Sequence, residues 1–421
     1  MTTAPAAGLA NLDLSDLALW GGGPPHETFE LLRREAPCHW SELGGFPWET
    51  GFWSVVRFAD IARVGRDFET FSSERGGILA MNRVMEHPPP GAPADAVDMQ
   101  RFMFIAQDPP RHDRMKALAQ RAFTPKRALD HTGRIREIIN LVYDNALERG
   151  DGTHFDLVQD VGTFVPAMVI GDMLGVPRED AEKLVDWTNR TTAFEDPRVV
   201  SDMADTWTAL MEVFGYVDGI VRDRTAHPQD DLTTAFVQAQ VDGERLTHEE
   251  VVMSWFLLMV AGNDSTRATF CSGLKSLLDD PEQLELVRSG AVSTEQAVEE
   301  FLRCHPAFAY MRRTATRDTE IAGQAVAEGD KVLLWYISGN RDETVFEDPH
   351  RFDVRRDPNL HQAFGGGGRH FCLGAGLARL EMRLWLEETL RRFPELRLDG
   401  DATRLASTFL NQWRTIPVAT A

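Results

Sequence analysis

A cysteine follows a run of glycines late in the chain, in the segment FGGGGRHFCLGAGLARLEMR at residues 364–383. The leucines after Cys372 have helical spacing, which predicts a helix that begins beside the sulfur. A helix N-terminus carries unpaired N–H groups and a partial positive charge, and both favour a thiolate over a thiol. Glycines in the preceding turn let the backbone approach a flat ligand closely. The segment therefore has the chemistry of a site that uses a negatively charged sulfur.

Polar residues also interrupt an apolar stretch, as AGNDST at residues 261–266. They lie inside a run with helical spacing that extends from Thr247 to about Leu278. Polar groups without partners cost free energy away from water, so their presence needs a reason. For a lone hydroxyl, a bond back to the preceding helical turn is reason enough. A glycine followed by an acid and two hydroxyls instead indicates proton delivery or ligand binding at a local opening of the helix.

Several familiar motifs fail when they are compared with the glycine-rich segment. GAGLAR at 374–379 begins like a dinucleotide fingerprint, but Arg379 stands at the third glycine position and a loop precedes it where a strand is required. The four glycines lack the Lys-Ser/Thr ending of a phosphate-binding loop, and the chain has neither HExxH nor GxSxG. Nucleotide, zinc-protease and serine-hydrolase sites are thereby excluded. What remains is a thiol at the N-terminal end of a helix, and a thiolate held in this way would be a good axial ligand for haem iron.

Composition and charge narrow the function classes further. The 421 residues carry a formal net charge of -21, which disfavours nucleic acid and anionic lipid as partners. The four cysteines are far apart and form no CxxC, which argues against a disulfide framework or a zinc site made of thiolates alone. The N-terminus has no basic start followed by an apolar run, so we expect no signal peptide, no membrane anchor and a cytoplasmic location.

The periodicities predict a helix-rich protein with minor strands. The segments 52–58 and 331–337 have the aromatic and β-branched content of strands. A helix is expected to end at Gly150, and the long central helix to begin at Thr247 with a capping box to Glu250. Residues 81–110 show almost no regular period, which is typical of a lid or binding segment or of a disordered one, and we favour a lid.

The glycine-cysteine segment resembles the cysteine-ligand loop of the cytochrome P-450 family, the haem-thiolate monooxygenases. Phe364, His370, Cys372 and Gly374 match the family pattern. Phe364 lies eight residues before Cys372, one more than in the commonest form of the motif. The longer FGGGG form resembles bacterial members that act on steroids, terpenoids and other lipids.

Three further motifs match the family in order. Glu300-x-x-Arg303 and a Pro-x-Arg-Phe pattern at Arg351 resemble the buried charged triad that braces the loop under the haem. Asp264 and Ser265 stand at the acid-alcohol pair of the oxygen-binding helix, where the family usually has Thr for Ser265, and Thr266 follows. The resemblance implies that these three residues pass protons to bound dioxygen. A serine rotamer is freer than that of a β-branched threonine, so the hydroxyl is expected to be held less firmly.

The resemblance also implies a cofactor and a fold. The cofactor is haem b, iron protoporphyrin IX, with Cys372 as its metal ligand. The residues expected to contact the haem propionates are His112, Lys116, Arg313 and His370. The family usually has Arg at the position of Lys116. The other residues expected to bind the cofactor are Phe364, Ala261 and Gly374. The fold is mainly α with a small β-rich lobe, and haem lies between the central helix and the Cys loop. We expect one domain over residues 1–421, with the N-terminal part, 320–340 and 390–421 contributing the lobe.

The implied reaction is hydroxylation of an apolar small molecule, namely a steroid, terpenoid or fatty lipid, with dioxygen and two electrons. Positions in the motifs suggest mostly apolar substrate-pocket walls, although any one of them could simply be core: Leu257, Val260, Ala309, Met311, Phe409 and Leu410. Two rival functions share the fold. One is a non-catalytic haem protein that stores or senses a ligand, and the other is a peroxygenase driven by hydrogen peroxide. The retained pair Asp264-Ser265 argues against both.

Electrons are expected from a separate ferredoxin plus ferredoxin reductase, because the chain shows no flavin or nicotinamide fingerprint. Ferredoxins are commonly acidic, so a local basic face would be needed on this acidic chain. The candidate residues surround the Cys: Arg369, Arg379, Arg383, Arg121, Lys126 and Arg127. The alternative is that these are scattered solubilising charges. We expect the protein to be a monomer.

Overall fold

The computed structural model describes residues 9, 12–42, 51–75, 78, 99–120, 123–193, 195–200, 202–241 and 243–420. Most of the segment 81–110, which we expected to form a lid, lies outside the described residues. Its last part forms two short 3-10 helices, Gln100–Phe102 and Phe104–Ala106. Phe104 and Ala106 are buried, so this part packs against the body of the protein.

Helices dominate the described residues, as the sequence predicts. Their bounds are α1 His26–Glu35, α2 Phe58–Arg66, α4 Arg111–Gln120, α5 Pro125–Asp130, α6 Thr132–Arg149, α7 Phe164–Leu174, α8 Ala181–Thr192, α9 Met203–Ala226, α10 Leu232–Gln238, α11 His248–Asp279, α12 Pro281–Arg288, α13 Thr294–Cys304, α14 Tyr336–Gly339 and α15 Ala375–Arg392. A π-helical segment, Leu157–Gly162, precedes α7. The strands are β1 Cys38–Ser41, β2 Phe52–Val55, β3 Phe71–Ser72, β4 His154–Asp156, β5 Gln240–Val241, β6 Glu244–Arg245, β7 Met311–Ala315, β8 Thr319–Ile321, β9 Gln324–Val326, β10 Lys331–Leu334, β11 Arg397–Leu398, β12 Thr403–Arg404, β13 Trp413–Thr415 and β14 Pro417–Ala419.

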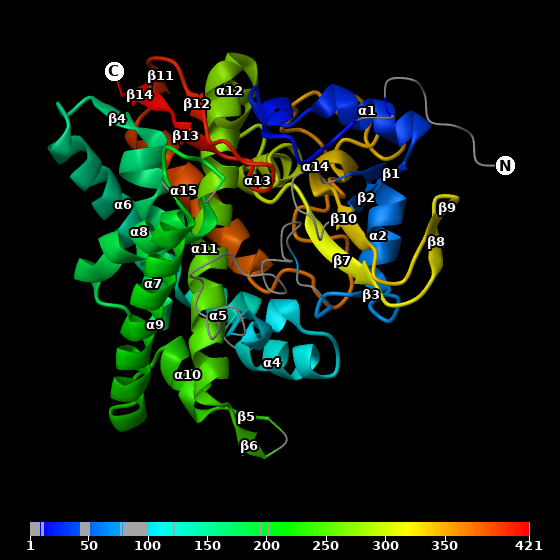
Figure 1. The fold of residues 1–421 in the computed structure, drawn as a ribbon. Helices are drawn as coiled ribbons and strands as arrows, with labels where there is room; N and C mark the ends of the chain where they lie inside the picture. The colour runs from blue at the N-terminus through cyan, green and yellow to red at the C-terminus, as the bar shows by residue number, and fades with distance from the viewer. Residues whose placement is uncertain are drawn as a thin grey trace.

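The long helix α11 runs through the middle of the molecule, and other helices pack around it (Figure 1). Its predicted start is confirmed: the Thr247 hydroxyl accepts from the Glu250 amide at 3.2 Å, and the Glu250 carboxylate accepts from the Thr247 amide at 2.9 Å. These two bonds satisfy N–H groups that a helix otherwise leaves unpaired. On the opposite half of α11, Phe270 stacks on Trp385 of α15, with ring centroids 3.8 Å apart. The crossing of α11 and α15 is therefore fixed by aromatic packing.

Five strands form the β-rich lobe, in the order β1-β2-β10-β7-β3 (Figure 1). The predicted strands 52–58 and 331–337 both exist but are shorter, because a helix begins immediately after each. Asp342 accepts from the amide of Phe58 at 2.8 Å, and this bond stabilises the first turn of α2. After β10, residues Tyr336–Gly339 form a helical turn.

The C-terminal strands do not join this lobe, contrary to the expectation for residues 390–421. Strand β14 lies between β11 and β4, with Val418 opposite Phe155, and β12 pairs only with β13. The three-stranded sheet β11-β14-β4 lies beside the helices at the far end of the molecule from the lobe (Figure 1). The composition of a segment can indicate a strand but not the strand with which it pairs. Pairing depends on which apolar face of the strand is buried and on the element that covers it.

One helical stretch among the described residues, Leu157–Leu174, is long and apolar enough to span a membrane by length and composition. Of this stretch, 72% is buried inside the protein, and its side chains belong to the largest hydrophobic cluster, which also contains the buried face of α11. Such burial is typical of a core helix.

We predict that Gly273→Ala lowers stability at the crossing of α11 and α13. A Cβ at this position would lie 2.1 Å from the buried Phe301 ring, so the core must shift at a cost of about 1–3 kcal/mol. Gly215→Ala on α9 is the matched control, because nothing lies within 4 Å of its Cβ and alanine favours the helix by about 0.5–1 kcal/mol. Denaturant unfolding of both variants measures the difference. Equal effects would contradict the packing.

Candidate functional site

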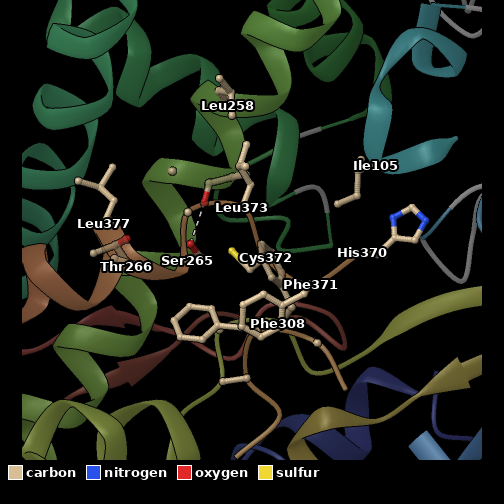
Figure 2. Close-up of a pocket in the computed structure, with 18 of the residues that line it drawn as sticks. Ile105, Leu258, Ser265, Thr266, Phe308, His370, Phe371, Cys372, Leu373 and Leu377 are labelled. Carbon is tan, nitrogen blue, oxygen red and sulfur yellow. Dashed lines mark hydrogen bonds between the residues drawn. The ribbon is translucent and has the colours of Figure 1, made fainter. Parts of the chain in front are cut away.

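A cavity separates α11 from the glycine-cysteine segment (Figure 2). It contains about 1480 Å³ of empty space, part of it open to solvent. Most lining side chains are apolar, whereas the polar ones gather at two places: beside Cys372 and on the middle turns of α11.

The backbone before Cys372 follows a path that requires glycine. Gly365, Gly367 and Gly368 have φ angles of 94°, 93° and 89°, which other residues rarely adopt. A Cβ on Gly368 would also lie 2.6 Å from the carbonyl oxygen of Gly65 on α2. The loop closes where the Cys372 amide donates to the Phe364 carbonyl at 3.0 Å. The glycines therefore let the loop press against α2 and present the sulfur to the cavity.

Cys372 is deep in the protein, but its side chain is exposed to the cavity (Figure 2). Burial raises the pKa of the Cys372 thiol, while the backbone amides of Gly374 and Ala375, then Lys116 and Arg379, lower it. The helix N-terminus acts as the sequence predicts, but burial outweighs it. A metal cation at the sulfur would reverse this balance, because a coordinating thiol gives up its proton. The position suits a metal-bound thiolate better than a free nucleophile.

A group of basic side chains, two cations and two histidines, lines the cavity at one side of the Cys loop. It comprises His112 and Lys116 from α4, Arg313 from β7 and His370. The rings of His112 and His370 lie 4.1 Å apart. His370 Nε2 is buried without a hydrogen-bond partner, and burial, Arg313 and His112 lower the pKa of His370 to about 2. A buried donor without a partner calls for a ligand, and carboxylates are the natural ligand for this group.

Lys116 has a second role that sequence reasoning did not foresee. Its Nζ donates to the carbonyls of Arg369 and Phe371 at 2.5 and 2.6 Å. The ammonium therefore ties α4 to the two residues on either side of His370. Three donors on a compact ammonium permit this, whereas the planar fork of an arginine would fit it less well.

The polar turns of α11 face the cavity with hydroxyls. Ala261, Ser265 and Thr266 all line it, and the Ser265 hydroxyl donates to the Ala261 carbonyl at 2.7 Å (Figure 2). This bond holds the serine in one rotamer, although Ser lacks the β-branch of Thr. Gly262 lets α7 approach, because its Cβ would lie 3.0 Å from Ile170.

Asp264 points away from the cavity, contrary to its expected place beside Ser265. Its side chain is fully buried, pairs with Arg267 and accepts from the Thr192 hydroxyl. Arg267 also donates to Asn189 at 3.0 Å, so the acid belongs to a network between α11 and α8. Burial raises the pKa of the Asp264 carboxyl, and Arg267 and Thr192 oppose this. One helical step of about 100° separates Asp264 from Ser265 and turns them to different faces.

The sequence motif Glu300-x-x-Arg303 forms a buried ion pair on α13. Arg303 Nε and Nη2 donate to the Glu300 carboxylate at 2.8 and 2.7 Å, and neither side chain is exposed. The guanidinium also donates to the carbonyls of Pro349 at 2.7 Å and Arg351 at 2.8 Å. The bonds to Pro349 and Arg351 reach a segment distant in sequence, so the pair braces the chain that leads to the glycine loop.

The third member of this cluster is Arg356, and the assignment of Arg351 was wrong. Arg356 Nε lies 3.5 Å from Glu300 Oε2 with its side chain 14% exposed. The side chain of Arg351 is exposed, and only its carbonyl reaches Arg303. A turn closed by the Arg351 amide and the Asp348 carbonyl at 3.0 Å directs Arg351 to solvent and returns Arg356 to the pair. The sequence pattern marks the segment but not this turn.

The expected substrate walls are only partly present. Leu257 and Met311 line the cavity, whereas Val260, Ala309, Phe409 and Leu410 are not among the residues that line it. Ala309 is buried behind the wall, where its amide donates to the Phe409 carbonyl at 2.8 Å. Phe409 stacks on Phe308, which is the ring that reaches the cavity, with centroids 4.9 Å apart. The sequence does not reveal Phe308 as a wall residue, because tertiary packing decides which of the two stacked rings, Phe308 or Phe409, faces the cavity.

Glu381 is a further cavity residue that sequence reasoning missed. It lies on α15 at 3% exposure, and its Oε1 has no hydrogen-bond partner. Burial alone raises the pKa of its carboxyl from 4.5 to about 8. The signal was present in the sequence, because Glu381 follows Leu377 by four positions and so shares the apolar face of the helix.

Comparisons with known proteins identify this architecture. The family model described as Cytochrome P450 matches residues 85–289 and 293–407. The chain belongs to the cytochrome P450 family. Among solved structures, a Mycobacterium marinum cytochrome P450 in complex with pseudoionone is similar with a TM-score of 0.88 and 34% identity, over 99% of this chain and 100% of that one.

Curated relatives of this cytochrome P450 cover nearly its whole length. The methyl-branched lipid omega-hydroxylase of Mycobacterium tuberculosis strain H37Rv is 35% identical over 99% of this chain and 96% of that protein. The steroid C26-monooxygenase of Rhodococcus jostii is 35% identical over 95% of this chain and 82% of that protein. The fold and the haem-thiolate monooxygenase class expected from the sequence are thereby confirmed.

Cytochromes P450 use haem b, and the residues present fit it. Cys372 offers its sulfur to the cavity, and the unpartnered Nε2 of His370 lines it together with the cations Lys116 and Arg313, which suit carboxylates such as the propionates. Phe364 and Gly374 line the same space.

We predict that Arg356→Met destabilises this cytochrome P450 and Arg351→Met does not. Removing Arg356 leaves Glu300 with one buried cation fewer, at a cost of about 1–2 kcal/mol, whereas the exposed Arg351 side chain contributes little. Urea unfolding of both variants, monitored by tryptophan fluorescence, provides the measurement. A larger loss in Arg351→Met would restore the assignment made from the sequence.

We also predict that Glu381→Gln is more stable than the wild type above acid pH. The pKa of this carboxyl is about 8 in the folded state and near 4.5 in the unfolded chain, so the native state binds more protons between these values. Wild-type stability therefore falls by roughly 1 kcal/mol per pH unit through this window, and the glutamine variant does not share that fall. Unfolding measured from pH 5 to pH 9 checks it. Parallel curves would show that Glu381 is not protonated.

Proposed function

We propose that this cytochrome P450 hydroxylates methyl-branched or steroid-type lipids within the cavity between α11 and the Cys loop. The observation that carries the proposal is the placement of the Cys372 sulfur on a large, mainly apolar cavity that also meets the hydroxyls of α11. The relatives named above act on a methyl-branched lipid and on steroids. A Bacillus megaterium cytochrome P450 solved with testosterone is similar as well, with a TM-score of 0.80 and 29% identity.

The residues of this chain would divide the binding of haem b among them. Cys372 ligates the iron, while His112, Arg313 and His370 hold the propionates. Lys116 supports this indirectly, because it ties the carbonyls beside His370 to α4. Haem b, when bound, supplies the activation of dioxygen and the insertion of one oxygen atom into a C–H bond. The protein supplies orientation, protons and exclusion of water.

The hydroxyls of Ser265 and Thr266 would handle protons at the oxygen side of the cavity. The reaction takes up dioxygen, two electrons and two protons, and it releases one hydroxylated product and one water. Ser265 already donates its proton to Ala261, so its oxygen is free to accept from an ordered water. Asp264 would act at a distance: its ion pair with Arg267 orients the turn that carries both hydroxyls.

Apolar walls decide which molecules fit. Ile105, Leu258 and Phe308 lie around the approach to Cys372 (Figure 2), and Leu257 and Met311 line the same cavity. Such walls bind hydrocarbon by removing it from water, at about 25 cal/mol per Å² of buried apolar area. A branched or fused-ring hydrocarbon fills a wide cavity better than a thin unbranched chain, and this supports the proposed lipid class.

Electrons would come from a ferredoxin plus ferredoxin reductase that dock near the Cys loop. The expected basic face is less basic than its sequence suggests, because Arg369, Arg379 and Arg383 pair with Asp113, Glu299 and Glu295. Arg127 is exposed, whereas Arg121 and the side chain of Lys126 lie outside the described residues. Exposed Phe371 adds an apolar contact of 43% exposure beside Arg369. We propose a monomeric, single-domain protein of the cytoplasm that meets these partners transiently.

We predict that Cys372→Ser abolishes the red-shifted absorption band that a thiolate ligand produces in the reduced, carbon monoxide-bound protein. A serine hydroxyl cannot replace the thiolate as electron donor to iron. Cys38→Ala is the control, because Cys38 is buried in β1 and does not line the cavity, so its band should persist. A band retained in Cys372→Ser would overturn the proposed function.

Turnover with ferredoxin but not with peroxide separates a monooxygenase from a peroxygenase, and electron delivery without product indicates a sensor.

A further inference from the structure

A second group of buried basic side chains gathers around Arg341, which does not line the haem cavity. This arginine lies two residues after α14 and is 6% exposed. Its Nη1 is buried without a hydrogen-bond partner, and none of the described residues forms an ion pair with its guanidinium. An arginine keeps its charge inside a protein, so burial without an anion costs free energy. Arg341 therefore lacks a ligand that the described side chains do not supply.

Two further unsatisfied nitrogens belong to α1, which packs against α14. His26 and Arg33 are seven residues apart, so they share one face of this helix. Arg33 Nη1 donates to the Ser338 carbonyl at 3.3 Å, and the same carbonyl accepts from the Arg341 amide at 2.9 Å. Nη2 of Arg33 and Nδ1 of His26 are buried without hydrogen-bond partners, like Nη1 of Arg341. The contact of α1 with the chain around α14 thus contains three nitrogens that need acceptors.

Positive charge surrounds His26 from several elements. Burial lowers the pKa of His26, and four neighbouring basic groups lower it further: Arg341, His350, His305 and Arg404. The ring therefore stays neutral, and in one tautomer it donates from Nδ1. The Arg404 guanidinium reaches the same end of α1, because a Cβ on Gly23 would lie 3.4 Å from it.

The carboxylates of this region are engaged by other groups. Glu343 and Glu300 each pair with another arginine, at 2.8 and 2.7 Å. Arg404 donates at 3.0 Å to the Asn411 side chain, which is neutral. Two guanidiniums, those of Arg341 and Arg404, thus lack a carboxylate partner among the described residues. Water could accept their hydrogen bonds but would leave the charge in place, whereas an anion accepts hydrogen bonds and also neutralises charge.

We propose that Arg341 is the centre of a buried binding site for a small inorganic anion of the chloride class, with His26 Nδ1 as a second donor and Arg33 beside it. A halide suits this site because it accepts N–H groups from any direction. The anion joins α1 to the segment after α14. That segment carries the Asn340 carbonyl, which accepts from Arg303 at 3.1 Å, so the anion also supports the brace behind the Cys loop. Neither haem nor substrate takes part in this site.

Crystals grown in sodium bromide provide the direct test, because bromide replaces chloride and scatters X-rays anomalously. We expect an anomalous peak in contact with Arg341 Nη1 in the haem-loaded wild type and no such peak in Arg341→Gln. Arg34→Gln is the matched control and should keep the peak, because it makes the same change on α1 at a side chain that is 60% exposed. A wild-type crystal without an anomalous peak at Arg341 would overturn the inference.

Urea unfolding of the same haem-loaded proteins measures binding in solution. Ionic strength is held constant while chloride replaces gluconate, a bulky anion. Above the dissociation constant, the unfolding equilibrium constant of the wild type and of Arg34→Gln should fall about tenfold for each tenfold rise in chloride. It should change less than about twofold in Arg341→Gln and in His26→Ala, which keeps every arginine and tests the site if Arg341→Gln fails to fold. A chloride response that is absent from the wild type, or equal in all four proteins, would mean an adventitious ion only and would overturn the inference.

Discussion

The structure depends on one tight contact, where a glycine backbone presses on α2 and delivers a cysteine to a cavity. A Cβ at Gly368 would collide with the carbonyl of Gly65, and the loop closes only through the bond from the Cys372 amide to Phe364. Neither contact involves the sulfur. They nevertheless set its position, because the backbone before it has almost no freedom once three left-handed glycines are in place. A catalytic sulfur held by backbone geometry does not depend on soft side-chain rotamers.

Buried charges hold this loop from behind. The ion pair of Glu300 and Arg303 bonds to carbonyls of the segment that leads to the glycines, and Arg356 completes the cluster. On the other side of α11, Asp264 and Arg267 link that helix to α8. Buried pairs of this kind add little net stability, but breaking one is costly, so they specify one arrangement of segments. Here that arrangement is the one that aligns α11 with the Cys loop.

The cavity divides its polar groups by function. Basic side chains gather at one side of the Cys loop, hydroxyls gather on α11, and Glu381 of α15 is the one carboxyl among the described residues that line the cavity. Everything else on its surface is mainly apolar, which favours a hydrocarbon substrate and keeps the electrostatic environment dry. Burial, and not a neighbouring charge, raises the pKa of the Glu381 carboxyl. The exclusion of water that favours lipid binding therefore also favours the protonated form of this acid.

Much of this protein could be predicted from the sequence, because some chemistry is local. The capping box at Thr247, the glycines before Cys372 and the spacing of Glu300 and Arg303 each act within a few residues, and the structure contains all three. The cation at Arg356, the inward ring of Phe308 and the outward turn of Asp264 required tertiary structure. Each depends on which of two adjacent side chains faces the interior, and that is decided by packing between segments far apart in the chain. Sequence thus determined the groups that do chemistry, and the fold determined which of them share a space.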